Sequence, residues 1–287
     1  MSLRNHVWRL PRRAGGSCVT LAAAGMLTAC ATAPLEQAGS LRSYDNLKAS
    51  DGVVTRSLLN LNKDDVLAAK TVRIIPTEFS PAAAQVSFTP AQRKLVSNAV
   101  DRSLCAGLSQ RFEVVPLSQP ADLTVQAIVT HAAPTDKAAV GLSKGASIAK
   151  TILLPGVPVP VPRVPIGLGS LSLEAEARSP GGRQKAAMVW GRGANALGSG
   201  RMSEEGDAYT LAAAFGEDFS KMLVTGVTPF GGSPTLPPFE SLGPLFGGAH
   251  KYPACEAFGR FPGLAGVLGD QMALPPEWTD KGAPKTD

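Results

Sequence analysis

Two serines lie in spacings that nucleophilic enzymes use. Gly141-Leu-Ser143-Lys-Gly145 matches G-x-S-x-G, in which a sharp strand-to-helix turn exposes the serine for attack on an acyl carbon. Ser147-Ile-Ala-Lys150 matches S-x-x-K, in which a lysine one helical turn away takes the proton of the serine. Either spacing would suit acyl transfer, so a serine hydrolase is one hypothesis for the chain.

The sequence around these serines does not supply the rest of such a site. The preceding residues, PTDKAAV, are a poor buried strand, and the S-D-N and K-T-G elements that accompany S-x-x-K in enzymes are absent. After the N-terminal segment the remaining histidines are His131 and His250. We therefore expect no catalytic residue and no enzyme activity, and a hydrolase using Ser143 or Ser147 is the alternative. The small residues of this stretch instead predict a packed or membrane-interfacial helix face.

Glu174 and Glu176 lie two residues apart on one face of a predicted strand. Two carboxylates at this spacing can act together or hold a hard cation, but no third ligand is evident, so we expect them on a solvated face of the sheet. Gly191-Arg-Gly193 follows the next strand outside any βαβ unit and predicts a strand exit rather than a dinucleotide loop. The sequence predicts neither a metal nor a cofactor.

Cys30 is the residue with the clearest chemistry. The chain begins MSLRNHVWRLPRR, with four arginines and no acid, and soon enters SCVTLAAAGMLTA, an uncharged stretch of 13 residues. That layout is typical of a secretory signal, and the stretch is shorter than the roughly 20 residues that a membrane-spanning helix needs. Leu27-Thr28-Ala29-Cys30 resembles the lipobox of bacterial lipoproteins, which implies cleavage after Ala29 and lipid on Cys30. An ordinary secretory signal with an incidental cysteine is the alternative.

The resemblance to a lipobox also implies a location. Attached acyl chains bury CH₂ groups worth roughly 0.8 kcal/mol each, and two or more chains hold a protein on a membrane stably. In bacterial lipoproteins an aspartate after the cysteine argues for the inner membrane, whereas Ala31 here implies the outer membrane. We expect a protein anchored in the outer membrane through Cys30 and facing the periplasm.

The charge of the mature chain differs from that of the whole sequence. Residues 1–29 contain four of the 28 basic residues and none of the 23 acidic ones, which leaves 24 basic against 23 acidic residues, a net charge of +1. The basic character of the whole chain is therefore largely that of the signal. No basic stripe with interleaved aromatic residues follows, so we expect no nucleic-acid partner.

Cys105 and Cys255 are the remaining thiols, because Cys18 leaves with the signal and Cys30 carries lipid. In an oxidising periplasm two such thiols suggest one disulfide. A pair of buried, unpaired cysteines is the alternative, since sequence alone does not place their Cα atoms within the roughly 7 Å that a bridge allows.

Composition and patterning divide the chain into four parts. Residues 1–29 are the lipoprotein signal peptide, residues 30–69 a lipidated tether and docking segment with partial order, and residues 70–225 a periplasmic α+β domain. An insertion at residues 131–169 ends in proline-rich sequence, which excludes a membrane helix there. Residues 226–287 hold 11 glycines and 10 prolines in 62 residues, which predicts an irregular tail.

The domain is predicted to have a β-α-β-β-β-β-α order, with two helices packed on a mostly antiparallel sheet. The first strand is TVRIIPTEF, which we expect to be ended by Pro76 and Pro81. The next strands are FEVVPL and ADLTVQAIVTHA, and SLSLEAEAR and RQKAAMVWGRG form a hairpin. A final helix is predicted from about Glu204 to Thr225.

The first helix of the domain has the clearest start signal. Thr89 is the N-cap, Pro90 occupies the first helical position and Gln92 completes a capping box. We expect the helix to end near Gln110. Its predicted inner stripe is Leu95, Val96, Ala99, Val100, Leu104 and Leu108, and its predicted solvated face is Arg93, Lys94, Asp101 and Arg102.

The chain resembles a family of Gram-negative lipoproteins known as domain of unknown function 3313. The resemblance is carried by LTAC, Leu41-Arg-Ser-Tyr44-Asp-Asn-Leu47, Ile75-Pro76, the hairpin and the final helix around Phe215 and Phe219. It covers about residues 30–225 and leaves the tail outside. Because the family has no assigned activity, the resemblance implies fold and compartment and leaves the function open.

The favoured hypothesis is an accessory protein without catalysis of its own, which binds an envelope protein in envelope assembly, transport or maintenance. Exposed apolar sequence in a folded domain usually marks interaction. We therefore expect the proline-rich insertion and the phenylalanine-rich tail to be the contact surfaces. The oligomeric state stays open.

Overall fold

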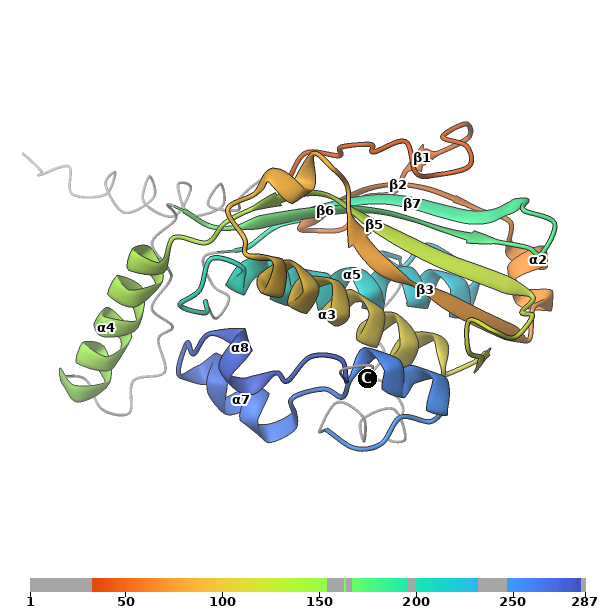
Figure 1. Cartoon of the computed structure of the whole chain (residues 1–287). Helices are drawn as coiled ribbons and strands as arrows, with labels where there is room; N and C mark the ends of the chain where they lie inside the picture. Colours follow the sequence, from red (N-terminus) through yellow and green to blue (C-terminus); the bar gives the residue numbers. More distant parts are fainter. Residues whose placement is uncertain (1–32, 154–162, 164–166, 196–199, 232–246, 285–287) are drawn as a thin grey trace, which may run out of the picture.

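A seven-stranded sheet forms the centre of the protein (Figure 1). The computed structural model describes residues 33–153, 163, 167–195, 200–231 and 247–284, so Ala29 and Cys30 lie outside the described residues. The strand order is β1-β2-β7-β6-β5-β3-β4. The strands are β1 (Lys48–Ala49), β2 (Thr55–Leu61), β3 (Thr71–Phe79), β4 (Glu113–Val114), β5 (Leu123–Ala133), β6 (Ser170–Arg178) and β7 (Gln184–Gly193).

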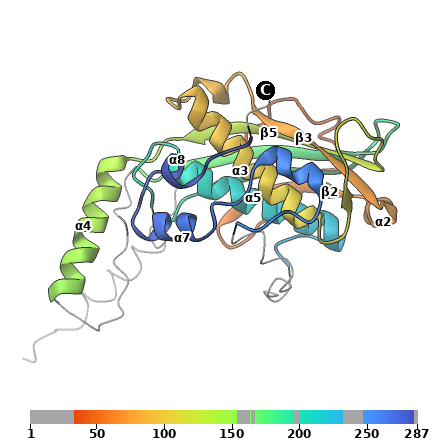
Figure 2. The same ribbon diagram turned by 60° about the horizontal axis from the view of Figure 1, so that its bottom comes forward.

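The predicted α+β class is confirmed. β3 runs parallel to β4 and β5, and the other neighbouring strands pair antiparallel. The helices are α2 (Lys63–Ala68), α3 (Pro90–Leu108), α4 (Lys137–Leu153), α5 (Gly206–Thr225), α7 (Gly263–Gln271) and α8 (Pro276–Thr279), and the 3-10 turns are η2 (Ala83–Gln85) and η4 (Pro253–Phe258). α3 and α5 cover one face of the sheet (Figures 1 and 2).

The predicted strand order was incomplete. β2 pairs with β7 from Thr55↔Arg192 to Leu61↔Ala186, so part of the segment expected to be a tether is an inner strand of the sheet. The segment TRSLLNL lacks the simple polar and apolar alternation of a half-buried strand, which is why its sequence did not indicate one. The expected strand FEVVPL is reduced to the two residues of β4.

Helix α3 begins as its sequence predicts. Thr89 Oγ1 accepts from the Gln92 N–H at 3.2 Å, and the Gln92 side chain accepts from the Thr89 N–H at 2.8 Å. The predicted inner stripe of α3 is buried throughout. α3 and α5 approach closely because each places a glycine against a serine of the other: a Cβ on Gly107 would overlap Ser220, and one on Gly216 would overlap Ser103.

The core lies between these helices and the sheet. Trp190 of β7 is fully buried, and its ring meets Phe215 of α5 edge-on with centroids 5.6 Å apart. The indole N–H donates to Asp218 Oδ2 at 2.9 Å, which satisfies the one polar atom of this side chain. The inward residues of β6 and β7 complete the core, as their alternation predicts.

Strand β3 continues through Pro76, contrary to expectation. Its register with β5 shifts between Ile75 and Glu78, so a bulge accommodates the residue that lacks an N–H. The Thr77 N–H donates to Asp101 Oδ1 at 3.0 Å, and the Thr77 hydroxyl donates to the same oxygen at 2.6 Å. The prediction that Asp101 faces solvent was therefore wrong: it is 1% exposed because it supplies the acceptors that the bulge needs.

Candidate interaction surfaces

Residues 34–44, which we call the strap, cross the face of the sheet opposite α3 and α5. The strap buries Glu174 and Glu176, so the prediction of a solvated acidic face was wrong. Glu174 Oε1 accepts from the Ser40 N–H at 2.8 Å, and Glu174 Oε2 accepts from the Tyr44 hydroxyl at 2.6 Å. Glu176 Oε2 accepts from the Arg42 N–H at 2.8 Å. The two carboxylates hold the chain that leads to Cys30.

A small apolar cluster reinforces the strap. Leu41 packs with Ala187 and Val189 on the outer face of β7. Burial, followed by the bond to Glu174, raises the pKa of Tyr44 to about 12, so its hydroxyl stays protonated as the donor. A docking segment was expected within residues 30–69, but its contacts with Glu174 and Glu176 were not, partly because two of them come from backbone N–H groups that carry no sequence signal.

Residues 247–284, which we call the C-terminal segment, lie across α3 (Figure 2). Cys105 of α3 and Cys255 of η4 form a disulfide with their Cα atoms 5.8 Å apart. Lys251 Nζ donates to the Ser109 carbonyl at 3.0 Å. A part of the chain expected to be irregular thus contains η4, α7 and α8 and is fastened to the domain.

A buried ion pair fastens the far end of the C-terminal segment. Arg102 was expected to face solvent, but it is 1% exposed and donates from Nη1 to Asp280 Oδ1 at 2.8 Å. Tyr209 of α5 donates its hydroxyl to Asp280 Oδ2 at 2.7 Å. Although burial alone would lower the pKa of Arg102, the Asp280 carboxylate raises it, so the guanidinium stays charged. The solvated-face prediction failed for Arg102 because its partner is far away in sequence.

Helix α7 is turned with its glycines inward. Gly263, Gly266 and Gly269 are buried, whereas Leu264, Val267 and Leu268 are 69%, 47% and 54% exposed. A Cβ on Gly266 would lie 2.6 Å from Pro262, and a Cβ on Gly269 would lie 2.6 Å from Thr279 of α8. Only glycine fits this inner side, so the larger apolar side chains point outward. We call Leu264, Val267 and Leu268 the α7 face.

Two cavities lie where α3 meets the C-terminal segment. One cavity of about 710 Å³ includes Lys94, Asn98 and Asp101 in its lining, and another of about 550 Å³ includes Gln92 and Glu277. Burial is the main cause that raises the pKa of Asp101 to about 7. Burial, followed by the neighbouring Glu277 carboxyl, raises the pKa of Glu205 to about 7 as well. Both carboxyls can therefore carry a proton near neutral pH.

The serines of the hydrolase hypothesis lie within helix α4, not at a strand-to-helix turn. Ser143 Oγ donates to the Ala139 carbonyl at 2.8 Å, and Ser147 Oγ donates to the Ser143 carbonyl at 2.9 Å. His131 Nδ1 lies 3.2 Å from Glu36 Oε1, and His250 Nε2 lies 2.9 Å from the Gly259 carbonyl. Each of these two serines and two histidines therefore has a contact partner of its own, a backbone carbonyl or, for His131, the Glu36 carboxylate.

The proline-rich part of the insertion lies outside the described residues, apart from Arg163. Arg163 donates to both carboxylate oxygens of Asp207, at 2.7 and 3.0 Å, and so ties the insertion to the start of α5. Within the described ranges, no group of three or more His, Cys, Asp or Glu side chains could hold a metal ion. No helix among the described residues is both long and apolar enough to cross a membrane.

The sequence profile of a family described as "Protein of unknown function (DUF3313)" matches residues 36–219. No curated protein matches the chain. Among solved structures, a PelC dodecamer from Paraburkholderia phytofirmans is similar with 10% identity and a TM-score of 0.35, covering 59% of this chain and 97% of that chain. A single-substitution variant of that dodecamer gives 11% identity, a TM-score of 0.31 and coverages of 62% and 96%.

Proposed function

Because the chain belongs to the DUF3313 family, whose function is unknown, we propose a role from the surfaces of its own fold. We propose that the protein is an outer-membrane lipoprotein that faces the periplasm and binds an envelope protein through the α7 face. It acts as an accessory in envelope assembly, transport or maintenance, with no catalysis of its own. The observation that carries this proposal is that the glycines of α7 face the protein interior while its larger apolar side chains face solvent.

The α7 face is exposed and apolar, yet it is held in place. Fully burying a Leu or Val side chain contributes about 1.5–3 kcal/mol, so leaving three of them in water forgoes stabilisation that a partner could supply. The Cys105–Cys255 disulfide precedes α7 and the Arg102–Asp280 ion pair follows it. A surface fixed on both sides loses little conformational entropy on binding. Its partner would present a complementary apolar groove or helix.

The partner-binding proposal is tested by purification from outer membranes with and without the α7 face. Leu264→Ser together with Leu268→Ser removes apolar surface without touching the buried glycines. We expect an envelope protein to co-purify with the parent chain and not with this double variant. Leu117→Ser, at a second exposed leucine away from α7, is the matched control and should retain it. Equal recovery with all three chains would contradict the proposal.

The anchoring proposal has a separate test. A clickable fatty acid fed to cells should label the parent protein and leave Cys30→Ser unlabelled. Cys30→Ser should also move from the membrane fraction to the soluble fraction, because the acyl chains supply the membrane affinity. Labelling that persists in Cys30→Ser would overturn lipidation at this residue.

The proposed lack of catalysis rests on the serine hydroxyls. Both Ser143 and Ser147 donate to carbonyl groups one turn earlier in α4, so each hydroxyl proton is engaged by the helix backbone. A fluorophosphonate probe should therefore label neither residue. Labelling that disappears in Ser143→Ala or Ser147→Ala would favour the hydrolase instead.

A further inference from the structure

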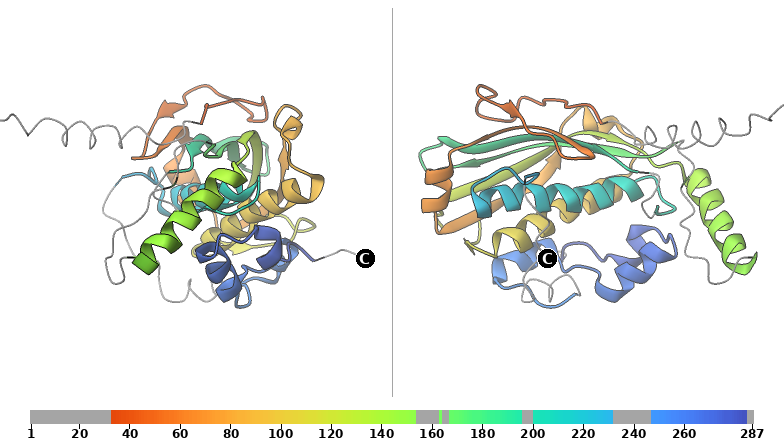
Figure 3. Two further views of the ribbon diagram at one scale, coloured as in Figure 1. Left: turned by 90° about the vertical axis from the view of Figure 1, so that its left-hand side faces the viewer. Right: turned by 180° about the vertical axis from the view of Figure 1, so that it is seen from behind.

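Helix α4 leaves the body of the protein at one end of the sheet (Figures 1 and 3). Leu142 and Ile148 of this helix are 72% and 62% exposed. Between Lys137 and Leu153 the helix contains three lysines and no acidic residue. α4 therefore combines exposed apolar side chains with a positive charge from its lysines, which is the composition of helices that lie in a membrane interface.

Two exposed methionines lie at the same end of the protein. Lys144 Nζ donates to the Gln271 carbonyl at 2.8 Å, which places the end of α7 beside α4. The Met202 N–H donates to the Ala273 carbonyl at 2.8 Å, so Met202 lies beside the chain that follows Met272. The two methionines are 45% and 60% exposed. We call Leu142, Ile148, Met202 and Met272 the end surface.

The strap leads toward the same end. Its later part meets Glu176 through the Arg42 N–H, whereas its first part meets Ser172, whose hydroxyl donates to the Pro34 carbonyl at 2.5 Å. Ser172 pairs with His131 close to the end of β5, from which the chain passes into α4. Going toward the N-terminus, the strap therefore runs along the sheet to the end from which α4 projects.

Chain geometry keeps Cys30 close to this end. Ala33 is 3% exposed and thus belongs to the folded body. The chain makes three Cα-to-Cα steps from Cys30 to Ala33, and each step spans at most about 3.6 Å in an extended chain, which gives a limit of about 11 Å. A lipid on Cys30 would hold the α4 end of the protein against the bilayer.

We propose that α4 lies on the surface of the membrane that holds Cys30, with the end surface in the interface between headgroups and acyl chains. This inference rests on the lipid anchoring in the proposed function. Lys144 and Lys150 would lie near lipid phosphates. The lipid surface fits better than a second copy of the chain, because a two-fold contact through α4 would bring lysines of the two copies together.

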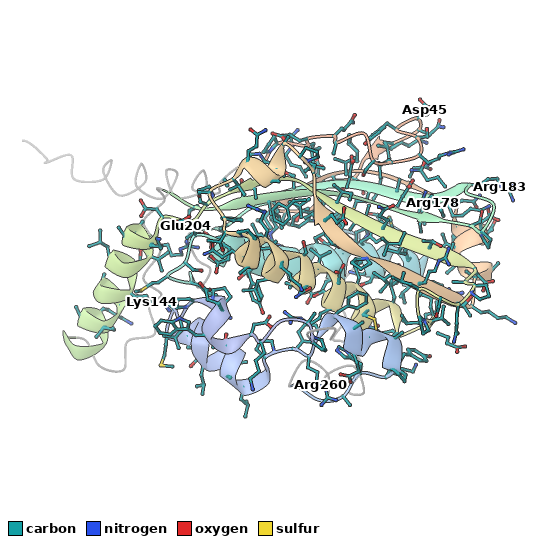
Figure 4. The ribbon with its side chains drawn as sticks, in the orientation of Figure 1. Asp45, Lys144, Arg178, Arg183, Glu204 and Arg260 are labelled. Carbon is teal, nitrogen blue, oxygen red and sulfur yellow. A yellow bond between two sulfur atoms is a disulfide. The ribbon has the colours of Figure 1, made fainter. Side chains whose placement is uncertain are left out.

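The test is a fluorescence-quenching measurement on the lipidated protein in vesicles that contain anionic lipid and nitroxide-labelled lipid. Ile148→Cys and Leu142→Cys each carry a fluorophore, and Arg183→Cys is the control. Arg183 lies in the turn between β6 and β7, at the other end of the sheet from Lys144 (Figure 4). Since Cys30 is acylated and Cys105 and Cys255 are bridged, each label reports one position.

We expect the lipid nitroxide to quench the labels at Ile148 and Leu142 several-fold more strongly than the label at Arg183. Equal quenching at the three positions would overturn the proposal. Disulfide-linked dimers through unlabelled Ile148→Cys would also overturn it, by showing a second copy on α4. Chain that carries no native lipid is tested as Cys30→Ser with a histidine tag at its N-terminal end bound to nickel-chelating lipid, so that the engineered cysteine stays the one free thiol and failure of the anchoring proposal is distinguished from failure of α4 docking.

Discussion

Asp280, which follows the short helix α8, pairs with the buried guanidinium of Arg102 on α3. The two residues are far apart in sequence, and their bond closes the C-terminal segment onto the domain. Together with the disulfide at Cys255 it turns a glycine- and proline-rich stretch into part of the fold. The α7 face lies between these two attachments.

Asp280→Asn should strongly destabilise the protein. Removing one partner of a buried ion pair typically costs about 3–5 kcal/mol, because the other charge stays buried without compensation. The free energy of unfolding in urea measures the effect. Glu256→Gln is the matched control, since it removes an exposed pair with Arg260 and should cost less than about 1 kcal/mol. Similar losses in both variants would show that the Arg102 pair is not a buried attachment.

Breaking the disulfide should free the C-terminal segment. The bridge spans 150 residues, and crosslinks over long loops typically contribute about 2–5 kcal/mol. We expect Cys105→Ala with Cys255→Ala to lower the free energy of unfolding by that amount and to speed limited proteolysis within residues 247–284. A nonreducing peptide map of the parent chain should contain the linked Cys105 and Cys255 peptides. A map with both thiols free would contradict the account.

Stability should decrease as the pH rises from about 4 to 7, in part because of Asp101. The pKa of Asp101 is about 7 in the folded chain and near the ordinary 3.8 in the unfolded chain. Within this window the folded state holds a proton that the unfolded state has released. One such proton contributes a slope of at most about 1.4 kcal/mol per pH unit. This stabilisation is complete below pH 4 and lost above pH 7.

Asp101→Asn should remove its share of the pH slope, as measured by urea unfolding at several pH values. Glu205→Gln should remove a second share, because the pKa of Glu205 is also raised to about 7. Glu256→Gln should leave the slope between pH 5 and 7 unchanged, since the Arg260 side chain lowers the pKa of Glu256. An identical slope in the parent and in Asp101→Asn would refute the role of this carboxyl.

Tyr44→Phe should loosen the strap. The tyrosine hydroxyl donates to a buried carboxylate, and hydrogen bonds to charged groups contribute about 1.5–3 kcal/mol. Hydrogen exchange of residues 34–44 should become faster while exchange in β6 changes little. Ser43→Ala removes only the two exposed hydrogen bonds between the Ser43 hydroxyl and Asp45 and serves as the control. Unchanged exchange in Tyr44→Phe would argue against the Glu174 contact as the attachment.

The sequence predicted those features that depend on neighbouring residues. Three such features are the capping box at Thr89, the alternation along β6 and β7 and the helical spacing in α5. Each is visible in the sequence because the residues that form it lie within one short segment. The wrong predictions for Asp101 and Arg102 share one cause, which is a partner distant in sequence. In an isolated helix Asp101 and Arg102 would be surface residues. In the folded chain Asp101 is buried against Thr77, and Arg102 is buried against Asp280.

The candidate surfaces could be predicted only in part. Apolar composition of the insertion and the tail indicated contact surfaces, but the direction of each side chain of α7 depends on Pro262 and Thr279 packing against its glycines. The position of the strap likewise depends on the pairing of Glu174 and Glu176 with backbone groups. These are properties of the assembled fold, and the periodicity of a single segment does not contain them.

The most direct test of the account is site-specific photo-crosslinking in living cells. A photoreactive amino acid at Val267 should capture one reproducible envelope protein, and the same group at Arg183 should not. The crosslink should disappear when Leu264→Ser and Leu268→Ser are added. Absence of a specific adduct at Val267, or an adduct that survives both substitutions, would contradict partner binding through the α7 face.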